Sequence, residues 1–393
     1  MRILISAGEA SGDMYAAQLA RALQPHFPDA HFYGCAGPRL KEAGVEVVVD
    51  SASLAVVGLA EVVSHLPRIY GQYRRLLRHV RRNPPDFAIL TDSPDFHLRL
   101  ARHLKSMGVP VFYLVAPQVW AWRQGRVKTI RRRVDKLFCL FPFEEGWFRE
   151  RGVDADYIGH PLAARVRPSS TKAEFFARHG LDPDLRTIVL LPGSRVGEAT
   201  RHLPDLLGAI EILRQTFAIQ AVVATPKSFA SAVAFENFRE RFSSLSIQVV
   251  EGETWDALAH ADLAFAASGT VTVEAAVLGT PMVTFYKVTA LSWWAGRRLV
   301  KVPYLSMVNL IADRRVVPEL IQNEMTPGTL ALAATEILAD PDRAQRMRED
   351  LAAVRQALSG EGDPLDKAAR LLLKKWAELK SQQTNRRQSG HGA

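Results

Sequence analysis

The chain has 393 residues, of which 48% are hydrophobic and 23% charged, and this composition argues against a disordered protein. Apolar runs such as 187–191 and 263–267 are far shorter than the ~20 residues that a transmembrane helix needs, so no membrane-spanning segment is expected. The net charge of +9 is unevenly spread, and the basic stretches 68–82 and 123–133 favour an anionic partner, either nucleic acid or a phospholipid surface, with a solvated helix face as the alternative. The two cysteines, Cys35 and Cys139, are expected to be buried thiols rather than a disulfide or a metal site.

The first half of the chain alternates short apolar segments with stretches of helical periodicity. Residues 3–6 predict a strand that runs through a glycine-rich turn, 8–12, into a helix over 13–23. Because a glutamate ends the first apolar stretch at Glu9, no signal peptide fits, and we expect a cytoplasmic protein. The other expected elements are strands over 31–34, 87–90, 111–115 and 136–140 and a helix over 96–107.

The alternation is interrupted near residues 159–161, and residues 169–171 have the composition of a linker. It resumes with strands expected over 187–191, 220–224, 248–250, 263–266 and 282–286. Strands that alternate with helices indicate parallel, doubly wound sheets. We therefore predict an α/β protein of two Rossmann-like domains facing a cleft, the GT-B plan of many glycosyltransferases. The predicted parts are domains over 1–165 and 166–358, a C-terminal helix over 359–381 that packs back across the domains, and a disordered tail over 382–393.

Two strand-to-helix turns in the second half are predicted to bind the phosphates of a nucleotide. The first turn contains Gly193, Ser194 and Arg195 and can offer backbone N–H groups and a guanidinium to an anion. The second opens with Ser268-Gly269-Thr270, and Glu274 lies one turn inside its helix, where it can bind the ribose hydroxyls. Each turn could instead be an ordinary connection with surface side chains, but the pair favours a nucleoside diphosphate.

The glycine-rich turn of the first half is a different kind of loop. It does not match the dinucleotide-binding pattern Gly-x-Gly-x-x-Gly, and no acidic residue ends a second strand at the expected distance, so NAD binding is rejected. The loop places Glu9, Ser11 and Asp13 at a helix N-terminus facing the cleft. A substrate-binding role for Asp13 and a purely local role in its first helical turn are equally compatible with this position.

Two carboxylates, Asp92 and Asp95, follow the buried strand over 87–90. Burial there can raise the pKa of a carboxyl group toward a value that suits a general base. Asp95 directly precedes a predicted helix and has the position of an N-cap, which leaves Asp92 as the candidate base. The sequence offers no His or Cys cluster to support a metal, and we expect neither a metal nor another cofactor.

The segment 56–82 combines apolar residues at helical spacing, interrupted by Pro67, with six arginines and no acid after Glu61. An apolar face flanked by arginines is typical of a helix that lies on anionic lipid, although a core-packed helix is the alternative. The residues predicted to face the membrane are Val63, Leu66 and Ile69. Nucleic-acid binding is disfavoured because the chain has no zinc-ligand spacing and no RNA-binding aromatic motif.

Several of these motifs resemble those of the lipid-A-disaccharide synthases. The likeness runs from about residue 1 to about residue 375 and departs from the family only mildly, with Gly-Glu-Ala for Gly-Glu-Thr and Thr-Asp-Ser for Ile-Asp-Ala around Asp92. The segments that carry it are 7–13, 36–39, 116–123, 191–195, 267–270 and 309–310. The Trp-Ala-Trp-Arg run at 120–123 is particularly specific to this family.

The resemblance implies an inverting enzyme that transfers 2,3-diacylglucosamine from its UDP-sugar to 2,3-diacylglucosamine 1-phosphate (lipid X). It implies that Asp92 is the catalytic base and that Arg195 and Asn309 are needed for activity. It also gives the arginine-rich helix a purpose, because an enzyme with two acylated substrates would lie on the anionic inner leaflet of the cytoplasmic membrane. A homodimer is possible. The residues assigned to the acceptor side of the cleft are Glu9, Ser11, Asp13, Gln118, Trp120, Trp122 and Arg123.

Other enzymes of UDP-N-acetylglucosamine remain as alternatives, namely the peptidoglycan glucosaminyltransferase and the UDP-N-acetylglucosamine 2-epimerase. An epimerase needs no acceptor, so the two classes differ in whether UDP release depends on lipid X.

Overall fold

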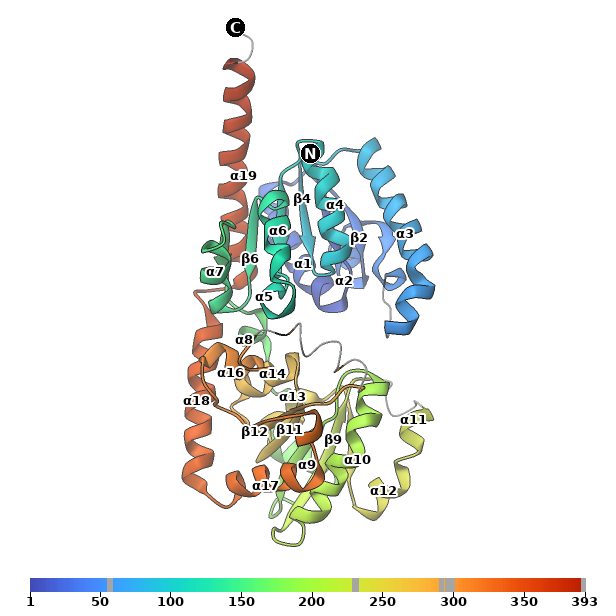
Figure 1. The fold of residues 1–393 in the computed structure, drawn as a ribbon, viewed down its shortest axis with the longest axis vertical. Helices are drawn as coiled ribbons and strands as arrows, with labels where there is room; N and C mark the ends of the chain where they lie inside the picture. The colour runs from blue at the N-terminus through green and yellow to red at the C-terminus, as the bar shows by residue number, and fades with distance from the viewer. Residues whose placement is uncertain (55–58, 228–232, 290–292, 294–299, 301, 390–393) are drawn as a thin grey trace. The chain divides into compact units, whose positions relative to one another are not determined.

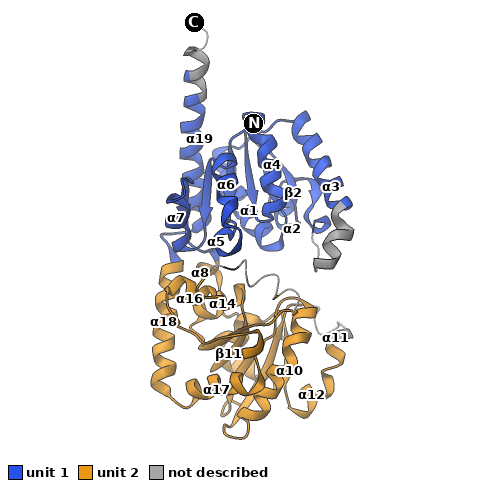
Figure 2. Ribbon diagram, viewed as in Figure 1, with its two compact units in different colours: residues 1–161, 359–393 blue, residues 162–358 orange. Residues whose placement is uncertain are grey.

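The computed structural model describes residues 1–54, 59–227, 233–289, 293, 300 and 302–389. The chain divides into two compact units (Figure 2). Unit 1 comprises Met1–Pro161 and Ser359–Ala393, and unit 2 comprises Leu162–Leu358. Each unit contains its own parallel sheet, which confirms the predicted α/β class (Figure 1).

Unit 1 is built on a seven-stranded parallel sheet in the order β3-β2-β1-β4-β5-β6-β7. Nearly all residues of its central strands are buried. Because helices cover both faces of the sheet, these strands are almost wholly apolar. Strands β3 and β7 were not predicted, because each is short and carries charged residues. The strands are β1 (Arg2–Ala7), β2 (His31–Ala36), β3 (Glu46–Asp50), β4 (Phe87–Thr91), β5 (Val111–Leu114), β6 (Lys136–Cys139) and β7 (Ala155–Tyr157).

Alternate residues of β1 point to opposite faces of this sheet. Ile3 and Ile5 belong to a core that includes α1 and α19, whereas Ser6 contacts α4 on the other face. Helices therefore cover both faces, as the doubly wound prediction requires. The helices of unit 1 are α1 (Ala10–Leu23), α2 (Pro38–Glu42), α3 (Leu59–Arg82), α4 (Pro94–Ser106), α5 (Val119–Trp122), α6 (Val127–Arg133), α7 (Pro142–Arg149) and α19 (Pro364–Ser389).

The C-terminal helix α19 packs on unit 1 along α1 and β6 (Figure 1). Its buried residues Leu365, Ala368, Ala369 and Leu372 recur at the spacing of one helical face. The helix continues to Ser389, so residues 382–389 are helical and the predicted disordered tail is corrected there. The polar residues of this stretch include glutamines and arginines, which propagate a helix well, and no glycine or proline interrupts it.

Unit 2 is built on a six-stranded parallel sheet in the order β10-β9-β8-β11-β12-β13. Its strands are β8 (Arg186–Leu191), β9 (Ile219–Thr225), β10 (Gln248–Glu251), β11 (Leu263–Ala267), β12 (Met282–Tyr286) and β13 (Glu319–Ile321). The first five match the predicted strands, whereas β13, with three residues, was missed. The helices are α8 (Pro161–Arg165), α9 (Lys172–His179), α10 (Val196–Leu213), α11 (Val233–Glu236), α12 (Arg239–Ser244), α13 (Thr254–Ala259), α14 (Thr270–Leu278), α16 (Met307–Ala312), α17 (Pro327–Leu338) and α18 (Pro341–Ser359).

Two further expectations concern the chain as a whole. Cys35 and Cys139 are free and buried, as predicted. Among the described residues, no helix combines the length and the apolar character that crossing a bilayer requires.

Candidate active site

The strand order of each sheet reverses direction at one point, and ligands of open α/β sheets bind beyond the carboxyl ends of the two strands that flank it. In unit 1 this point lies between β1 and β4, which pair in parallel with Ala7 beside Thr91. In unit 2 it lies between β8 and β11, with Leu191 beside Ala266. The predicted motifs follow these four strands, so the topology brings them together in two pairs.

In unit 1, the loop after β1 surrounds the carboxylate of Asp92. The Oδ1 atom accepts a hydrogen bond from the backbone N–H of Gly8 at 2.8 Å, and Oδ2 accepts one from Glu9 at 3.2 Å. A Cβ atom at Gly12 would overlap Asp92 Oδ2, and one at Gly8 would overlap Ser93 Oγ. The glycines are therefore needed for the close approach of this loop, including the start of α1 at Ala10, to the end of β4.

The Asp92 carboxyl group has the electrostatic character of a general base. Burial raises its pKa to about 7, and hydrogen bonds from the Gly8 and Glu9 amides and from the Ser93 side chain oppose that rise. A general base whose pKa lies near the working pH is deprotonated in a useful fraction of the molecules and is still basic enough to accept the proton of a hydroxyl group.

Backbone strain marks the same edge of the sheet. Asp92 and Ser93 have φ of 52° and 36°, and Val115, just past β5, has φ of 65°. A non-glycine residue in this left-handed region costs on the order of 1–3 kcal/mol, and such residues cluster at functional sites. The three lie after the adjacent strands β4 and β5.

Asp95 was predicted to cap the helix after β4, but the structure places Ser93 at the N-cap and Asp95 inside the first turn of α4. Its carboxylate is paired with Arg126 and, at 3.4 Å, with Arg123. Pro94 accounts for the shift, because proline is favoured at the first helical position.

The other acceptor-side predictions fall into two groups. Glu9, Ser11 and Gln118 are exposed, and so is Trp122, at 43%, with the Arg123 guanidinium 4.2 Å above its ring. These five side chains are therefore accessible to a ligand of unit 1.

Asp13 and Trp120, by contrast, are buried and bonded within the protein. The Asp13 carboxylate accepts hydrogen bonds from the N–H groups of Gly37, Arg39 and Leu40 at 2.7–3.3 Å and so holds the start of α2. The Trp120 indole donates to Glu144 Oε1 at 2.9 Å. Both residues thus support the structure of unit 1, and their predicted contacts with the acceptor stay predictions.

In unit 2, the two predicted phosphate turns follow the adjacent strands β8 and β11. Gly193 has φ of 128°, and a Cβ there would overlap Glu198, so this turn requires glycine. Ser194 and Arg195 are exposed where α10 begins, and Gly269 and Thr270 are exposed where α14 begins. Two helix N-termini beside one another provide backbone N–H groups and positive dipole ends for a diphosphate.

Ser268 and Glu274 complete this turn differently. The Ser268 hydroxyl donates to the Leu305 carbonyl at 2.9 Å and so fixes the loop before α16, and its predicted contact with UDP stays a prediction. Glu274 is partly exposed, and burial raises its pKa to about 7 against a hydrogen bond from Trp255. Its exposed part remains compatible with the predicted ribose contact.

Asn309 lies wholly inside unit 2 and uses its whole side-chain amide within the protein. Its Oδ1 accepts from the N–H groups of Val316 and Val317 at 2.7 and 2.9 Å, and its Nδ2 donates to the Val317 carbonyl and to Glu319 Oε1. Glu319 in turn binds the N–H groups of Leu305 and Ser306. Asn309 thus supports the loop bonded to Ser268, and its predicted importance for activity stays a prediction.

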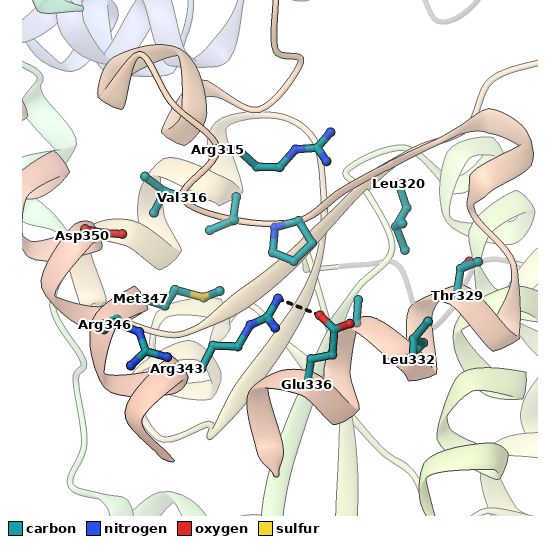
Figure 3. A pocket seen from close by; sticks show the side chains of 13 residues that line it. Arg315, Val316, Leu320, Thr329, Leu332, Glu336, Arg343, Arg346, Met347 and Asp350 are labelled. Atoms are coloured by element: carbon teal, nitrogen blue, oxygen red, sulfur yellow. Dashed lines mark ion pairs between the residues drawn. The ribbon is translucent and has the colours of Figure 1, made fainter. Parts of the chain in front are cut away.

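A hollow of about 520 Å³ lies in unit 2 between the segment 315–320 and helices α17 and α18 (Figure 3). Its rim carries the ion pair of Arg343 with Glu336 at 2.6 Å. None of the predicted site residues lines it, but Val316 and Val317, which Asn309 binds, do. The hollow is thus separate from the two phosphate turns.

The predicted membrane-facing residues are described only in part. The side chains of Val63 and Leu66 lie outside the described residues, and Ile69 is half-buried. Farther along α3, Leu76 and Val80 are fully buried, which fits the core-packed alternative for that end, whereas Tyr70 is 58% exposed. The arginines of this helix are all exposed, namely Arg68, Arg74, Arg75, Arg78, Arg81 and Arg82.

Sequence reasoning missed several buried polar residues behind these loops. His97 and Tyr113 contact the backbone of Asp92, and His202 contacts the carbonyl oxygens of Pro192 and Lys287 at 2.6 and 2.9 Å. A histidine on the apolar face of a predicted helix was the available signal for His97 and His202.

Comparison with known proteins agrees with the fold and the motifs. The family model described as lipid-A-disaccharide synthetase matches residues 3–371. A lipid-A-disaccharide synthase from Solibacter usitatus is 56% identical over 368 residues, covering 94% of this chain and 96% of the relative. One from Myxococcus xanthus is 42% identical over 375 residues, covering 95% and 97%.

Similar solved structures include a UDP-GlcNAc 2-epimerase from Neisseria meningitidis bound to UDP-GlcNAc, with a TM-score of 0.62 and 11% identity, covering 96% of this chain and 100% of that one. The glycotransferase of kitacinnamycin gives a TM-score of 0.63 at 15% identity, covering 95% and 99%. At such identities the likeness shows the GT-B fold alone, and the epimerase alternative is not favoured over the much closer synthases. The family model matches most of this chain, and the two relatives align with it over nearly their whole length. The chain therefore belongs to the lipid-A-disaccharide synthases, the glycosyltransferases of lipid A biosynthesis.

Proposed function

We propose that the chain transfers 2,3-diacylglucosamine from UDP-2,3-diacylglucosamine to the 6-hydroxyl of lipid X, giving a β-1,6-linked disaccharide 1-phosphate and UDP. The observation that carries the proposal is the pairing of motifs at the two switch points. A half-buried carboxylate with a pKa of about 7 stands at one, and two exposed helix N-termini with an arginine stand at the other. The donor is α-linked and the product β-linked, so one in-line displacement suffices.

In this mechanism Asp92 acts on the acceptor. Its carboxylate takes the proton of the 6-hydroxyl while the oxygen forms a bond to the anomeric carbon of the donor. The bond from that carbon to the diphosphate breaks in the same step, and UDP leaves with the bonding electrons. The exposed Glu9, Ser11, Gln118, Trp122 and Arg123 are the groups of unit 1 available to bind the acceptor.

Arg195 and the amides of the two phosphate turns act on the donor. Negative charge grows on the diphosphate as the glycosidic bond breaks, and donors already aimed at that position stabilise the transition state more than the ground state. Arg195 is exposed at the N-cap of α10 and can fork onto two phosphate oxygens. Glu274 is proposed to bind the ribose.

The first experiment measures UDP release from purified protein with UDP-2,3-diacylglucosamine, with and without lipid X. UDP release should require lipid X, and mass spectrometry should detect the disaccharide 1-phosphate, because an inverting transferase needs an acceptor. UDP-N-acetylglucosamine serves as a donor control, because it carries only an amide-linked acetyl group in place of the two acyl chains of the substrate. UDP release that is independent of lipid X would contradict the proposal, and conversion of UDP-N-acetylglucosamine into an isomeric UDP-sugar would point to the epimerase alternative.

We also propose that α3 binds the anionic surface of the inner membrane. Its arginines are exposed, and an anionic surface attracts each nearby arginine by about 1 kcal/mol. The protein should therefore co-sediment with vesicles that contain phosphatidylglycerol, not with pure phosphatidylcholine vesicles, and high salt should release it. Reversing Arg74 and Arg78 to glutamate should weaken binding at least ~30-fold.

A matched control variant has the same net charge as the variant with Arg74 and Arg78 reversed. Reversal of the exposed Arg348 and Arg370, which lie on α18 and α19, changes the charge equally but should leave vesicle binding largely intact. Equal losses of vesicle binding in the two variants would mean that overall charge, not α3, binds the lipid.

Replacing Val63, Leu66 and Ile69 by serine should also release the protein from vesicles without moving its folding transition. A decrease of ~1 kcal/mol or more per residue in the free energy of unfolding would instead place these residues in the core.

A further inference from the structure

The backbone carbonyl of Asp92 is held from two sides by side chains that the proposed mechanism does not use. The Tyr113 hydroxyl, from β5, donates a hydrogen bond to this oxygen. The His97 ring, from α4, places Nδ1 3.0 Å from the same oxygen. Tyr113 and His97 are both fully buried, so water does not compete for either contact.

The protonation of His97 follows from its surroundings. Burial lowers its pKa to about 4, so the ring is neutral and carries one N–H. A carbonyl oxygen can only accept, which places that hydrogen on Nδ1. The other nitrogen, Nε2, lies 2.8 Å from Ser6 Oγ and therefore accepts from the serine hydroxyl. The Asp92 carbonyl thus selects the tautomer, and Ser6, in β1, satisfies the other ring nitrogen.

The anchored carbonyl belongs to a strained residue. Asp92 has φ of 52°, a conformation that an aspartate leaves readily unless its surroundings oppose the change. In this conformation the carbonyl points toward His97 and Tyr113, while the carboxylate is directed to the Gly8 and Glu9 amides. The backbone carbonyl and the side-chain carboxylate of this one residue are therefore held by different partners.

We infer that His97 and Tyr113 are positioning residues, which clamp the Asp92 carbonyl and so keep its carboxylate in the orientation needed to take the acceptor proton. The inference rests on the proposed function, because it assigns these residues a role through Asp92. A displacement of about 1 Å in a catalytic group can lower the rate ~10²-fold. Loss of the clamp should therefore lower kcat while leaving UDP binding, which we assign to unit 2, unchanged.

The test compares two substitutions of His97. An asparagine amide reaches the position of Nδ1, so His97→Asn can still donate to the Asp92 carbonyl. A glutamine amide reaches the position of Nε2, so His97→Gln loses that donor. We expect kcat of the Gln variant to fall ~10- to 10²-fold and that of the Asn variant to fall much less, with KM for lipid X and the Kd for UDP nearly constant. Tyr113→Phe, which removes only the hydroxyl, should lower kcat in the same way.

The pH dependence gives a readout that a loss of packing would not move. Among the charged groups near Asp92, Glu9 after β1 raises the pKa of Asp92, and the Asp92 charge in turn raises the pKa of Cys35 in β2 and of Tyr113 in β5. Asp95 of α4 also raises the pKa of Tyr113, and Arg126 lowers it. A carboxylate released from its buried position would regain water, and its pKa would fall from about 7 toward the ordinary value. In His97→Gln and Tyr113→Phe, the acidic limb of the pH profile of kcat should therefore move to lower pH.

His103→Gln is the matched control, because His103 lies on the same helix, α4, and no hydrogen bond joins its ring to Asp92 among the described residues. This variant should keep the wild-type kcat and pH profile. Equal losses in His97→Asn and His97→Gln, or an unshifted acidic limb in Tyr113→Phe, would overturn the inference. If Asp92→Asn itself stays active, the proposed base is wrong, whereas an inactive Asp92→Asn with a fully active His97→Gln refutes the clamp alone.

Discussion

Replacing Asp92 by asparagine should lower kcat by ~10²–10⁴-fold and leave the affinity for UDP nearly unchanged. Asparagine keeps the size of the side chain but cannot take a proton from the acceptor hydroxyl. The amides of Gly8 and Glu9, which now bind the carboxylate, still have an oxygen to bind. Steady-state kinetics with lipid X and calorimetry with UDP measure the two quantities separately.

The same strand supplies the control for this prediction. Asp86 directly precedes β4, at its amino end, where its carboxylate binds the N–H of Arg2 at 2.8 Å. Asp86→Asn should therefore keep most of its activity. In the wild-type protein, kcat should rise with pH through about 7, because the base acts only when deprotonated. An Asn variant that keeps more than about a tenth of wild-type kcat would rule out Asp92 as the base.

Replacing Arg195 by alanine should lower kcat ~10²–10³-fold and also weaken UDP binding. A guanidinium on the diphosphate contributes in the ground state and contributes more as the leaving group gains charge. The decrease in kcat should therefore exceed the decrease in UDP affinity. Arg195→Lys should be intermediate, since a lysine keeps the charge but not the two-pronged hydrogen bonding.

Arg186 provides the corresponding control, because it begins β8 at the end opposite to Arg195. Its guanidinium donates to the Leu338 carbonyl at 2.7 Å, so Arg186→Ala should affect stability more than catalysis. Calorimetry that finds unchanged UDP affinity in Arg195→Ala would remove this residue from the phosphate site, and the helix N-termini would then have to bind the diphosphate alone.

The secondary structure could be predicted well where local pattern and burial agree. Strands buried on both faces must be continuous apolar runs, so the central strands of both sheets were evident. Strands at the sheet edges, such as β3 and β13, are short and carry polar residues, because only one neighbour strand stabilises them. Their positions depend on that neighbour and not on their own sequence.

The sequence by itself determined the class of fold and the loops that carry chemistry, because glycines, carboxylates and arginines directly after strands have few other uses. Only the tertiary structure decided which polar side chains are free for a ligand. The bonding partners of Asp13 and Trp120 are 24 to 27 residues away, and those of Asn309 are 7 to 10 residues away, in the segment that leads into β13. The clamp on Asp92 depends on Tyr113, which is 21 residues away and which the sequence does not distinguish from any other aromatic residue of a buried strand. A buried polar group is stable only when its hydrogen bonds are satisfied, and the chain supplies those partners only after its strands have been ordered into a sheet.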